Sequence, residues 1–213
     1  MPMQTKHAVP WVIAAVAAMG LAAALYEVQR ERGRQGRHPA LFREFAIRSD
    51  LAEATAPILV IGDSITEGAK LPREIGGRAV VNGGIDGATV EDFERMAPAL
   101  LAGKPSFVVI ALGTNGTAES LRTSYPALLN RLKPLFPHLM AVGVTPQAGA
   151  ELKNAAIRAA ADREGIHFFT VPLPAGSMRL DGVHLNDAGY RIYTPALVAE
   201  ISDRVGQRPP QAR

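Results

Sequence analysis

The chain has 213 residues, enough for one ordinary domain that buries a core without disulfides or metals. It contains no cysteine, which excludes a disulfide framework, a thiol nucleophile and a zinc site built on thiolates. From His38 onward the basic and acidic residues balance, 18 against 18. A nucleic-acid binder carries a basic excess on its folded part, so no nucleic-acid partner is expected.

The first segment is apolar and flanked by basic residues. Ala8 to Tyr26 carries no charge, and as a helix it would span most of a hydrocarbon core about 30 Å thick. Lys6 precedes it, and four arginines follow it, at 30, 32, 34 and 37. This flanking charge predicts membrane association through an N-terminal helix. Ala22-Ala23-Ala24 offers the small-x-small pattern of a signal-peptidase site, so a cleaved signal peptide stays an alternative to an anchor.

The sequence gives two opposed indications of orientation. More basic residues follow the apolar run than precede it, which favours a cytoplasmic domain. A short basic N-terminus before an Ala-rich stretch favours export. We expect residues 1–37 to be an anchor or signal segment with its linker, and residues 38–213 to be one domain. The protein is expected to be membrane-tethered or secreted, with that domain on the extracytoplasmic side.

Next along the chain, residues 27–38 are rich in Arg, Gln and Gly and indicate a linker. Leu41, Phe42, Phe45 and Leu51 then recur at helical spacing, which predicts a short helix packed on the domain.

After Pro57 short apolar runs alternate with helical patterns. The runs predict buried strands at 58–61, 79–81, 107–112, 139–144 and 166–169, and the helical patterns lie at 90–101, 118–132, 150–164 and 187–205. Strands that are apolar throughout and separated by helices are typical of a parallel sheet covered on both faces. In such sheets the ligand site lies beyond the carboxyl ends of the strands.

Four unusual segments stand at or near those ends. They are Gly62-Asp63-Ser64-Ile65-Thr66, Asn82-Gly83-Gly84-Ile85-Asp86-Gly87, Gly113-Thr114-Asn115-Gly116, and Asp181-Gly182-Val183-His184-Leu185 just before the last helix. Each alone is a weak signal, because Gly, Asn, Asp and Ser are ordinary turn residues. Their coincidence at predicted strand and loop ends indicates a catalytic site.

The order and spacing of the four segments resemble the conserved blocks of the SGNH (GDSL-type) serine hydrolase superfamily, over about 150 residues from Pro57. The resemblance implies a flavodoxin-like three-layer α/β/α sandwich with about five parallel strands. It implies Ser64 as nucleophile, His184 as base and Asp181 as the acid that orients the base. The oxyanion hole would be the amides of Ser64 and Gly84 with the side-chain amide of Asn115. Many members have Asp after this Asn; here Gly116 follows, and a different bracing of the loop is expected.

The chemistry requires these residue types. A serine hydroxyl is a poor nucleophile until a base takes its proton, and histidine can take it and later protonate the leaving alcohol. A carboxylate fixes the tautomer of the histidine, and Asp181 lies three residues before His184, within one tight loop. We expect Asp63 to form hydrogen bonds within its turn, and Asn186 and Asp187 to cap the last helix.

Three function classes follow from these observations. The first is hydrolysis of a carboxylic ester through an acyl-serine intermediate, with a small acyl group such as acetyl on a polysaccharide, or with a lipid acyl or thioester substrate. The second is an O-acetyltransferase on a polysaccharide, which shares the first half-reaction. The third is a non-catalytic flavodoxin-like module that binds a phosphate or flavin. The loop from Pro172 to Met178 could line an acyl pocket or be a plain connection. No metal and no cofactor are expected.

Overall fold

The computed structural model describes residues 8–100, 103–136 and 138–206, and for residues 8–14, 16–17 and 27–39 it describes the backbone alone. The chain divides into two compact units, one ending at Phe42 and one beginning at Arg43. The division of function between residues 1–37 and 38–213 stays a prediction.

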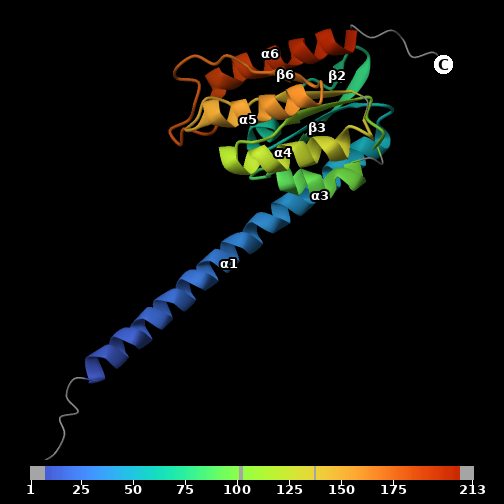
Figure 1. Ribbon diagram of the computed structural model, residues 1–213. Helices are drawn as coiled ribbons and strands as arrows, with labels where there is room; N and C mark the ends of the chain where they lie inside the picture. Colours follow the sequence, from blue (N-terminus) through green and yellow to red (C-terminus); the bar gives the residue numbers. More distant parts are fainter. Residues whose placement is uncertain (1–7, 101–102, 137, 207–213) are drawn as a thin grey trace, which may run out of the picture. The chain divides into compact units, whose positions relative to one another are not determined.

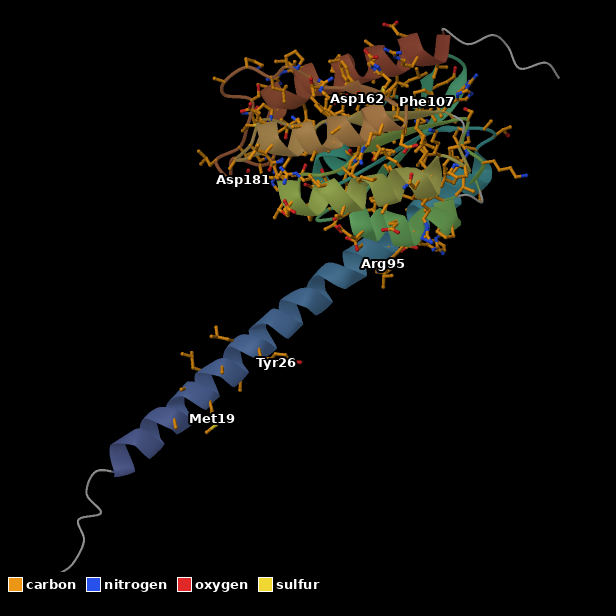
Figure 2. The ribbon with its side chains drawn as sticks, viewed as in Figure 1. Met19, Tyr26, Arg95, Phe107, Asp162 and Asp181 are labelled. Atoms are coloured by element: carbon orange, nitrogen blue, oxygen red, sulfur yellow. The ribbon has the colours of Figure 1, made fainter. Side chains whose placement is uncertain are left out.

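The first helix is continuous. α1 runs from Ala8 to Glu53, so the expected linker at 27–38 and the expected short helix after it are parts of one helix. No helix among the described residues is long and apolar enough to cross a bilayer. The membrane prediction depends on Ala8 to Tyr26, where the side chains of residues 8–14 and 16–17 lie outside the described part; Met19 and Tyr26 project from this helix (Figure 2).

The prediction that the apolar residues from Leu41 to Leu51 pack on the domain is partly wrong. Leu51 is buried as expected, and Ile47 is buried one turn earlier. Leu41, Phe42 and Phe45, however, are exposed by 61%, 74% and 73% rather than packed on the domain. In a helix residues one or two positions apart do not share a face, so this part of α1 can bury Ile47 and Leu51 while its other apolar residues face outward.

The second unit is a three-layer arrangement around a mostly parallel sheet (Figure 1). The strands are β1 (Ile58–Gly62), β2 (Glu74–Ile75), β3 (Arg78–Gly84), β4 (Phe107–Ala111), β5 (Leu139–Val142) and β6 (His167–Phe169). Their order is β2-β3-β1-β4-β5-β6. The five parallel strands therefore follow the 2-1-3-4-5 order of flavodoxin-type sheets, as the resemblance implied.

The sheet also contains a strand that was not predicted. β2 pairs antiparallel with β3 at the edge of the sheet, with Glu74 opposite Ala79. Gly76 and Gly77 join the two strands with φ of 57° and 75°. Two consecutive positive φ angles define the tight hairpin turn for which Gly-Gly is suited. The two residues of β2 are too few to show the alternation of apolar and polar residues that predicts a strand. The Gly-Gly pair is the sequence feature that indicates this hairpin.

The helices form the two outer layers. α3 (Val90–Leu100), α4 (Ala118–Leu132) and α5 (Ala150–Arg163) contact one another in sequence and form one layer (Figure 1). α6 (Asp187–Gly206) packs on the opposite face, where Leu197 and Ile201 share an apolar core with Val60 and Val109. The strand centres are buried on both faces, which explains their uninterrupted apolar runs.

Candidate active site

The predicted nucleophile stands where the first strand turns into a short helix. Ser64 is the first residue of α2 (Ser64–Gly68), and Asp63 is the N-cap, its carboxylate accepting a hydrogen bond from the Ile65 amide at 3.1 Å. The turn requires Gly62, because a Cβ there would lie 1.9 Å from Thr66 Oγ1 and 2.8 Å from the Ala111 carbonyl. The half-buried Ser64 side chain is therefore held at the carboxyl end of β1.

The two other predicted catalytic side chains reach Ser64 from the loop before α6. His184 Nε2 lies 3.0 Å from Ser64 Oγ, and His184 Nδ1 lies 2.8 Å from Asp181 Oδ2. Gly182, with φ of 68°, permits the tight turn between the acid and the base. The structure thus joins Ser64, His184 and Asp181 in one chain of hydrogen bonds, although 120 residues separate the serine from the histidine.

Asp181 is fixed as an anion by its own loop. Its Oδ1 accepts hydrogen bonds from the amides of Val183 and His184, each at 2.9 Å, which leaves Oδ2 for the imidazole. The amide of His184, then that of Val183 and then the imidazole lower the pKa of Asp181 to about 2. The carboxylate therefore stays ionised, and it favours the proton on Nδ1 and the lone pair on Nε2, the arrangement a base requires.

Asp63 connects the nucleophile to the third motif. It is fully buried, and its Oδ2 accepts a hydrogen bond from the Thr114 amide at 3.3 Å. Burial raises the pKa of Asp63, and the hydrogen bonds from Thr114 oppose that rise. Its function in the turn was expected, while its link to the loop that carries Asn115 was not.

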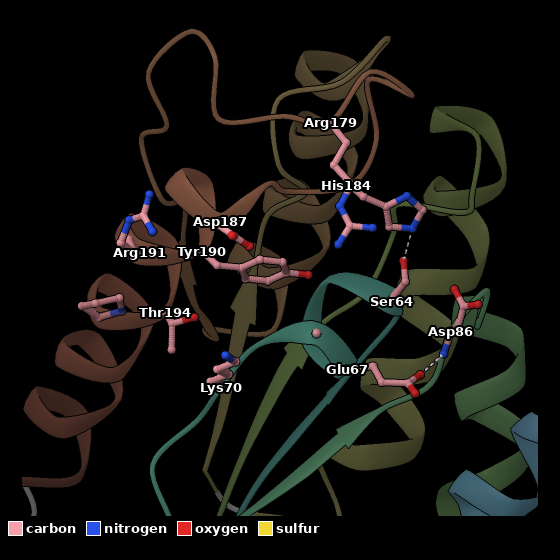
Figure 3. A pocket seen from close by; sticks show the side chains of 12 residues that line it. Ser64, Glu67, Lys70, Asp86, Arg179, His184, Asp187, Tyr190, Arg191 and Thr194 are labelled. Carbon is pink, nitrogen blue, oxygen red and sulfur yellow. Dashed lines mark hydrogen bonds between the residues drawn. The ribbon is translucent and has the colours of Figure 1, made fainter.

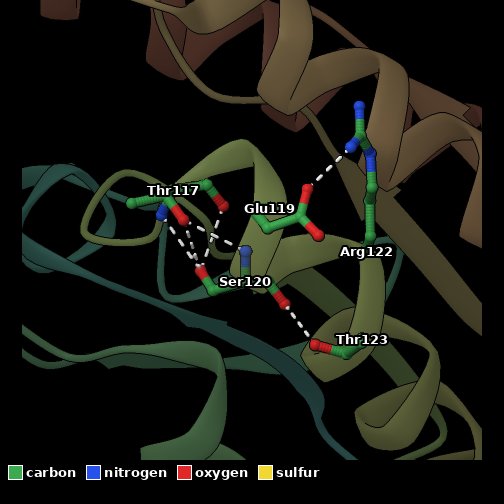
Figure 4. Close-up of polar contacts among 5 residues, drawn as sticks. All are labelled: Thr117, Glu119, Ser120, Arg122 and Thr123. Carbon is green, nitrogen blue, oxygen red and sulfur yellow. Dashed lines mark hydrogen bonds and ion pairs between the residues drawn. The ribbon is translucent and has the colours of Figure 1, made fainter.

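The loop of Asn115 is braced on three sides. Lys153 Nζ donates to the Thr114 carbonyl at 2.7 Å, and Asn115 Nδ2 donates to the Ala88 carbonyl at 3.0 Å. Immediately after Gly116, Thr117 and Ser120 form a capping box that fixes the start of α4 (Figure 4). An amide nitrogen carries two protons, so Asn115 keeps one for a substrate.

The oxyanion prediction for Gly84 disagrees with its hydrogen bonding. Its amide donates to Asn82 Oδ1 at 2.9 Å, and its carbonyl accepts from Arg43. A Cβ at this position would lie 2.1 Å from the amide nitrogen of Glu67 and 2.6 Å from its Cα. Gly84 is thus a packing residue that lets β3 approach α2 closely, and its N–H is already engaged.

Gly87 of the same segment, which the sequence interpretation did not name, is a second candidate donor. It is exposed, has φ of 70°, and makes no hydrogen bond through its amide within the described part of the chain. It directly precedes Ala88, whose carbonyl binds Asn115. Three of the six residues from Asn82 to Gly87 are glycines, and residue type alone does not tell which of their amides is available to a substrate. The Asp86-Gly87 pair, however, is a turn signal, and amides in a turn are often left without the backbone partner that a strand provides.

A cavity of about 950 Å³ opens beside Ser64 and His184 (Figure 3). In this view Lys70, Arg191 and Thr194 lie to the left of Ser64, Asp86 lies to its right and Glu67 lies below it. Apart from Gly68 and Pro195, every lining residue is charged or polar. The cavity thus offers charged and hydrogen-bonding groups to a ligand, together with apolar surface from the side-chain stems and the Tyr190 ring.

The loop after β6 lines a different cavity. Pro172, Leu173 and Pro174 border a space of about 660 Å³ together with Val144 and Pro146, and neither Ser64 nor His184 borders that space. The acyl-pocket interpretation of this loop is therefore not supported. Asn186 does cap α6 as expected, because its Oδ1 accepts from the Gly189 amide at 2.9 Å. Within the described ranges, no group of three or more His, Asp or Glu side chains is arranged to hold a metal ion.

Comparison with known proteins gives a family and a fold. The model of the GDSL-like Lipase/Acylhydrolase family matches residues 60–192. No curated protein matches the chain.

Similar solved structures include one from Streptococcus pneumonia named for platelet activating factor, with a TM-score of 0.67 and 20% identity over 85% of this chain and 99% of that one. An acetylxylan esterase from Geobacillus stearothermophilus has a TM-score of 0.57 and 19% identity over 75% and 98%. The M. smegmatis aryl esterase has a TM-score of 0.55 and 19% identity over 70% and 99%. At these identities the likeness shows the fold.

Proposed function

Since the chain belongs to the GDSL-like lipase/acylhydrolase family and is an ester-hydrolysing enzyme, we propose that Ser64 is its nucleophile and forms an acyl-serine intermediate. The observation that carries this proposal is the hydrogen-bonded chain from Ser64 Oγ through His184 to Asp181, with links of 3.0 and 2.8 Å. A base within this distance of a hydroxyl can take its proton as the hydroxyl attacks.

The proposed reaction has two balanced halves. Ser64 Oγ attacks the ester carbonyl while its proton passes to His184 Nε2, and Asp181 stabilises the imidazolium that forms. The tetrahedral intermediate collapses, the C–O bond to the alcohol breaks, and His184 gives its proton to the leaving oxygen. A water then attacks the acyl-serine with His184 again as base, and the acid leaves as Ser64 Oγ recovers its proton.

Three neutral donors are proposed to stabilise the oxyanion. They are the amide of Ser64 at the start of α2, the remaining amide proton of Asn115, and the amide of Gly87 in place of that of Gly84. Preorganised donors of this kind typically contribute about 10²- to 10³-fold each to the rate. The contact of Asn115 with the carbonyl of Ala88 supports this set, because it holds the side chain beside the residue that follows Gly87.

The cavity supports a small acyl group on a polar alcohol. The charged ends of Lys70, Arg179 and Arg191 and of three acids border the cavity and can hydrogen-bond a polar alcohol, while the apolar surface between them, worth roughly 0.8 kcal/mol per buried CH₂ group, can take a short acyl group. A carbohydrate hydroxyl and its neighbours match such a lining, as in the acetylxylan esterase of similar fold. We therefore assign the substrate as an acetylated carbohydrate rather than a lipid.

Hydrolysis of p-nitrophenyl esters from acetyl to palmitoyl, together with an acetylated xylose, tests this assignment. We expect kcat/KM to fall as the acyl chain lengthens, and acetate to be released from the sugar. A preference for palmitoyl would contradict the assignment. Transfer of acetyl to an added polyol, in place of acetate release, would show that the enzyme is a transferase that shares the first half-reaction.

We propose further that residues 1–37 tether the enzyme to a membrane, with the catalytic domain on the extracytoplasmic side. The uncharged run from Ala8 to Tyr26, with basic residues on both sides, supports the tether, and the short basic N-terminus before this Ala-rich run supports the extracytoplasmic side. Fractionation of cells that express the full chain or residues 38–213 tests it. The full chain is expected in the membrane fraction, with its catalytic domain open to protease from the outer side; recovery of the full chain in the soluble fraction would contradict the tether.

A further inference from the structure

The carboxyl end of β3 has an edge that no strand in the described part of the chain covers. Backbone groups of a strand point alternately to its two sides, and the amide of Ile85 bonds to the carbonyl of Gly62 at 3.0 Å on the β1 side. The carbonyls of Asn82 and Gly84 therefore face the opposite side. There β2 reaches only Ala79, so these two carbonyls have no ladder partner. Unpaired edge groups of this kind need another donor.

Arg43, at the start of the second compact unit, supplies that donor. Its Nε donates to the Gly84 carbonyl at 2.8 Å and its Nη2 donates to the Asn82 carbonyl at 2.7 Å. The planar guanidinium fork thus takes the place of a neighbouring strand. The same Nη2 lies 3.2 Å from Asn82 Oδ1. Among the described residues no carboxylate pairs with Arg43, so its hydrogen bonds go to β3.

Asn82 carries the connection on to the helix of the nucleophile. Its Nδ2 donates to the carbonyls of Thr66 and Ala69, at 2.9 and 3.1 Å. These carbonyls lie at the C-terminal end of α2, where each also accepts one backbone hydrogen bond, Thr66 from the Ala69 amide and Ala69 from the Leu71 amide. A continuous set of hydrogen bonds therefore runs from Arg43 through Asn82 to the helix that begins with Ser64. Gly84, the other residue bound by Arg43, leads into the loop of Gly87.

We propose that Arg43 is a positioning residue of the active site, which holds the end of β3 and, through Asn82, the helix of Ser64. This inference rests on the proposed function of Ser64. Arg43 touches neither the triad nor the cavity, and it acts by fixing two backbone segments that contribute amides to the oxyanion. A displacement of about 1 Å in such groups can cost about 100-fold in rate.

The test compares Arg43→Ala and Arg43→Lys with wild type in the full chain, using p-nitrophenyl acetate. Arg43→Ala is expected to lower kcat by about 10- to 100-fold with little change in KM. Arg43→Lys is expected to recover part of this loss, because an ammonium can reach one of the two carbonyls. Combining Arg43→Ala with Asn82→Ala should add little to the loss of Asn82→Ala alone, since both changes break one connection.

The control is Arg48→Ala, five residues along the same helix, whose side chain forms an ion pair with Glu44. This variant is expected to keep wild-type kcat. Hydrogen exchange measured by mass spectrometry gives a second readout that needs no activity: residues 64–69 and 84–88 should exchange faster in Arg43→Ala and at the normal rate in Arg48→Ala. Unchanged exchange, or a lower melting temperature with wild-type kcat, would overturn the inference. An inactive wild type would instead contradict the function proposed for Ser64.

Discussion

At the scale of single residues, the position of the Asp181 carboxylate is fixed more firmly than that of most carboxylates in exposed loops. Asp181 is exposed, yet two backbone amides and the imidazole of His184 all donate to it. The loop thus supplies the charge stabilisation that a buried triad acid obtains from its surroundings. The same contacts shape the loop, so Asp181 contributes to local stability as well as to catalysis.

The lowered pKa of Asp181 gives a prediction for the dependence of stability on pH. A carboxyl whose pKa falls from 3.8 to about 2 on folding stabilises the folded state above about pH 4, and this contribution disappears as the pH falls toward 2. The free energy of unfolding of wild type should therefore exceed that of Asp181→Asn at pH 7, with the difference shrinking between pH 4 and 2. Urea denaturation over this range measures it, and a difference independent of pH would contradict the account.

Asn115 gives a second prediction at this scale. Asn115→Ala removes one neutral oxyanion donor and should lower kcat by about 10²- to 10³-fold, with a small change in KM. Asn130→Ala, an exposed position on α4, is the matched control and should retain wild-type kinetics. Steady-state kinetics with p-nitrophenyl acetate decide between the outcomes; a loss confined to KM would show that Asn115 binds substrate without stabilising the transition state.

Single residues also show how far the sequence could be interpreted. The types and order of Ser64, Asp181 and His184 predicted that these side chains meet, and the hydrogen bonds in the structure agree, while their catalytic functions stay a prediction. The oxyanion donor in the Asn82–Gly87 segment was harder to predict, and the sequence interpretation named Gly84 without considering Gly87. Both are glycines in one segment, and the difference lies in the partner of each amide, which depends on where β3 ends and how the Asn82 side chain turns.

At the scale of elements, α2 is a helix of one turn that neighbouring elements hold in place. Its five residues are too few for a stable isolated helix. β3 binds its end through Asn82, and Tyr190 of α6 donates its hydroxyl proton to the Ile65 carbonyl at 3.2 Å. The position of Ser64 therefore depends on elements distant in the sequence.

Close packing between β3 and α2 can be tested at Gly84. A methyl group in Gly84→Ala would meet backbone atoms of Glu67 and Thr66 within 2.6 Å, so the helix must shift. We expect the free energy of unfolding to fall by about 1–3 kcal/mol and kcat to fall with it. Gly206→Ala, where nothing lies within 4 Å, should change neither. Thermal unfolding and kinetics of both variants check this, and a fully active, stable Gly84→Ala would contradict the packing.

The elements themselves were largely predictable where a pattern had room to repeat. The expected helices at 118–132 and 187–205 agree with α4 and α6 to within one residue. β3 is longer than its apolar run, because Asn82, Gly83 and Gly84 pair with β1 although none of them is apolar. These residues belong to the strand because they pair with β1, and no local property of the sequence predicts that pairing.

At the scale of the whole molecule, the catalytic unit includes the end of α1. Ile47 and Leu51 are buried by 100% and 98%, and the backbone of Gly103 approaches Leu51 so closely that a Cβ would lie 2.6 Å from it. The last turns of this helix are therefore part of the enzyme's core and not a spacer. The sequence showed the apolar residues here but could not tell which of them face inward.

A matched pair of substitutions on α1 tests this conclusion. Leu51→Ala should lower the free energy of unfolding by about 2–5 kcal/mol, the usual cost of emptying a buried leucine site. Phe45→Ala, at a position 73% exposed, should change it by less than about 0.5 kcal/mol. Urea denaturation of the two variants measures both values, and equal effects would contradict the assignment of this segment to the core.

The measurement that tests the central claim most directly is the hydrolysis of p-nitrophenyl acetate by wild type and by Ser64→Ala, with both proteins shown to be folded. We predict turnover by wild type and none above the background rate by Ser64→Ala, because His184 then has no hydroxyl to activate. Intact mass after rapid quenching should show an added acetyl group on wild type alone. Equal turnover by the two proteins would contradict the assignment of Ser64 as nucleophile.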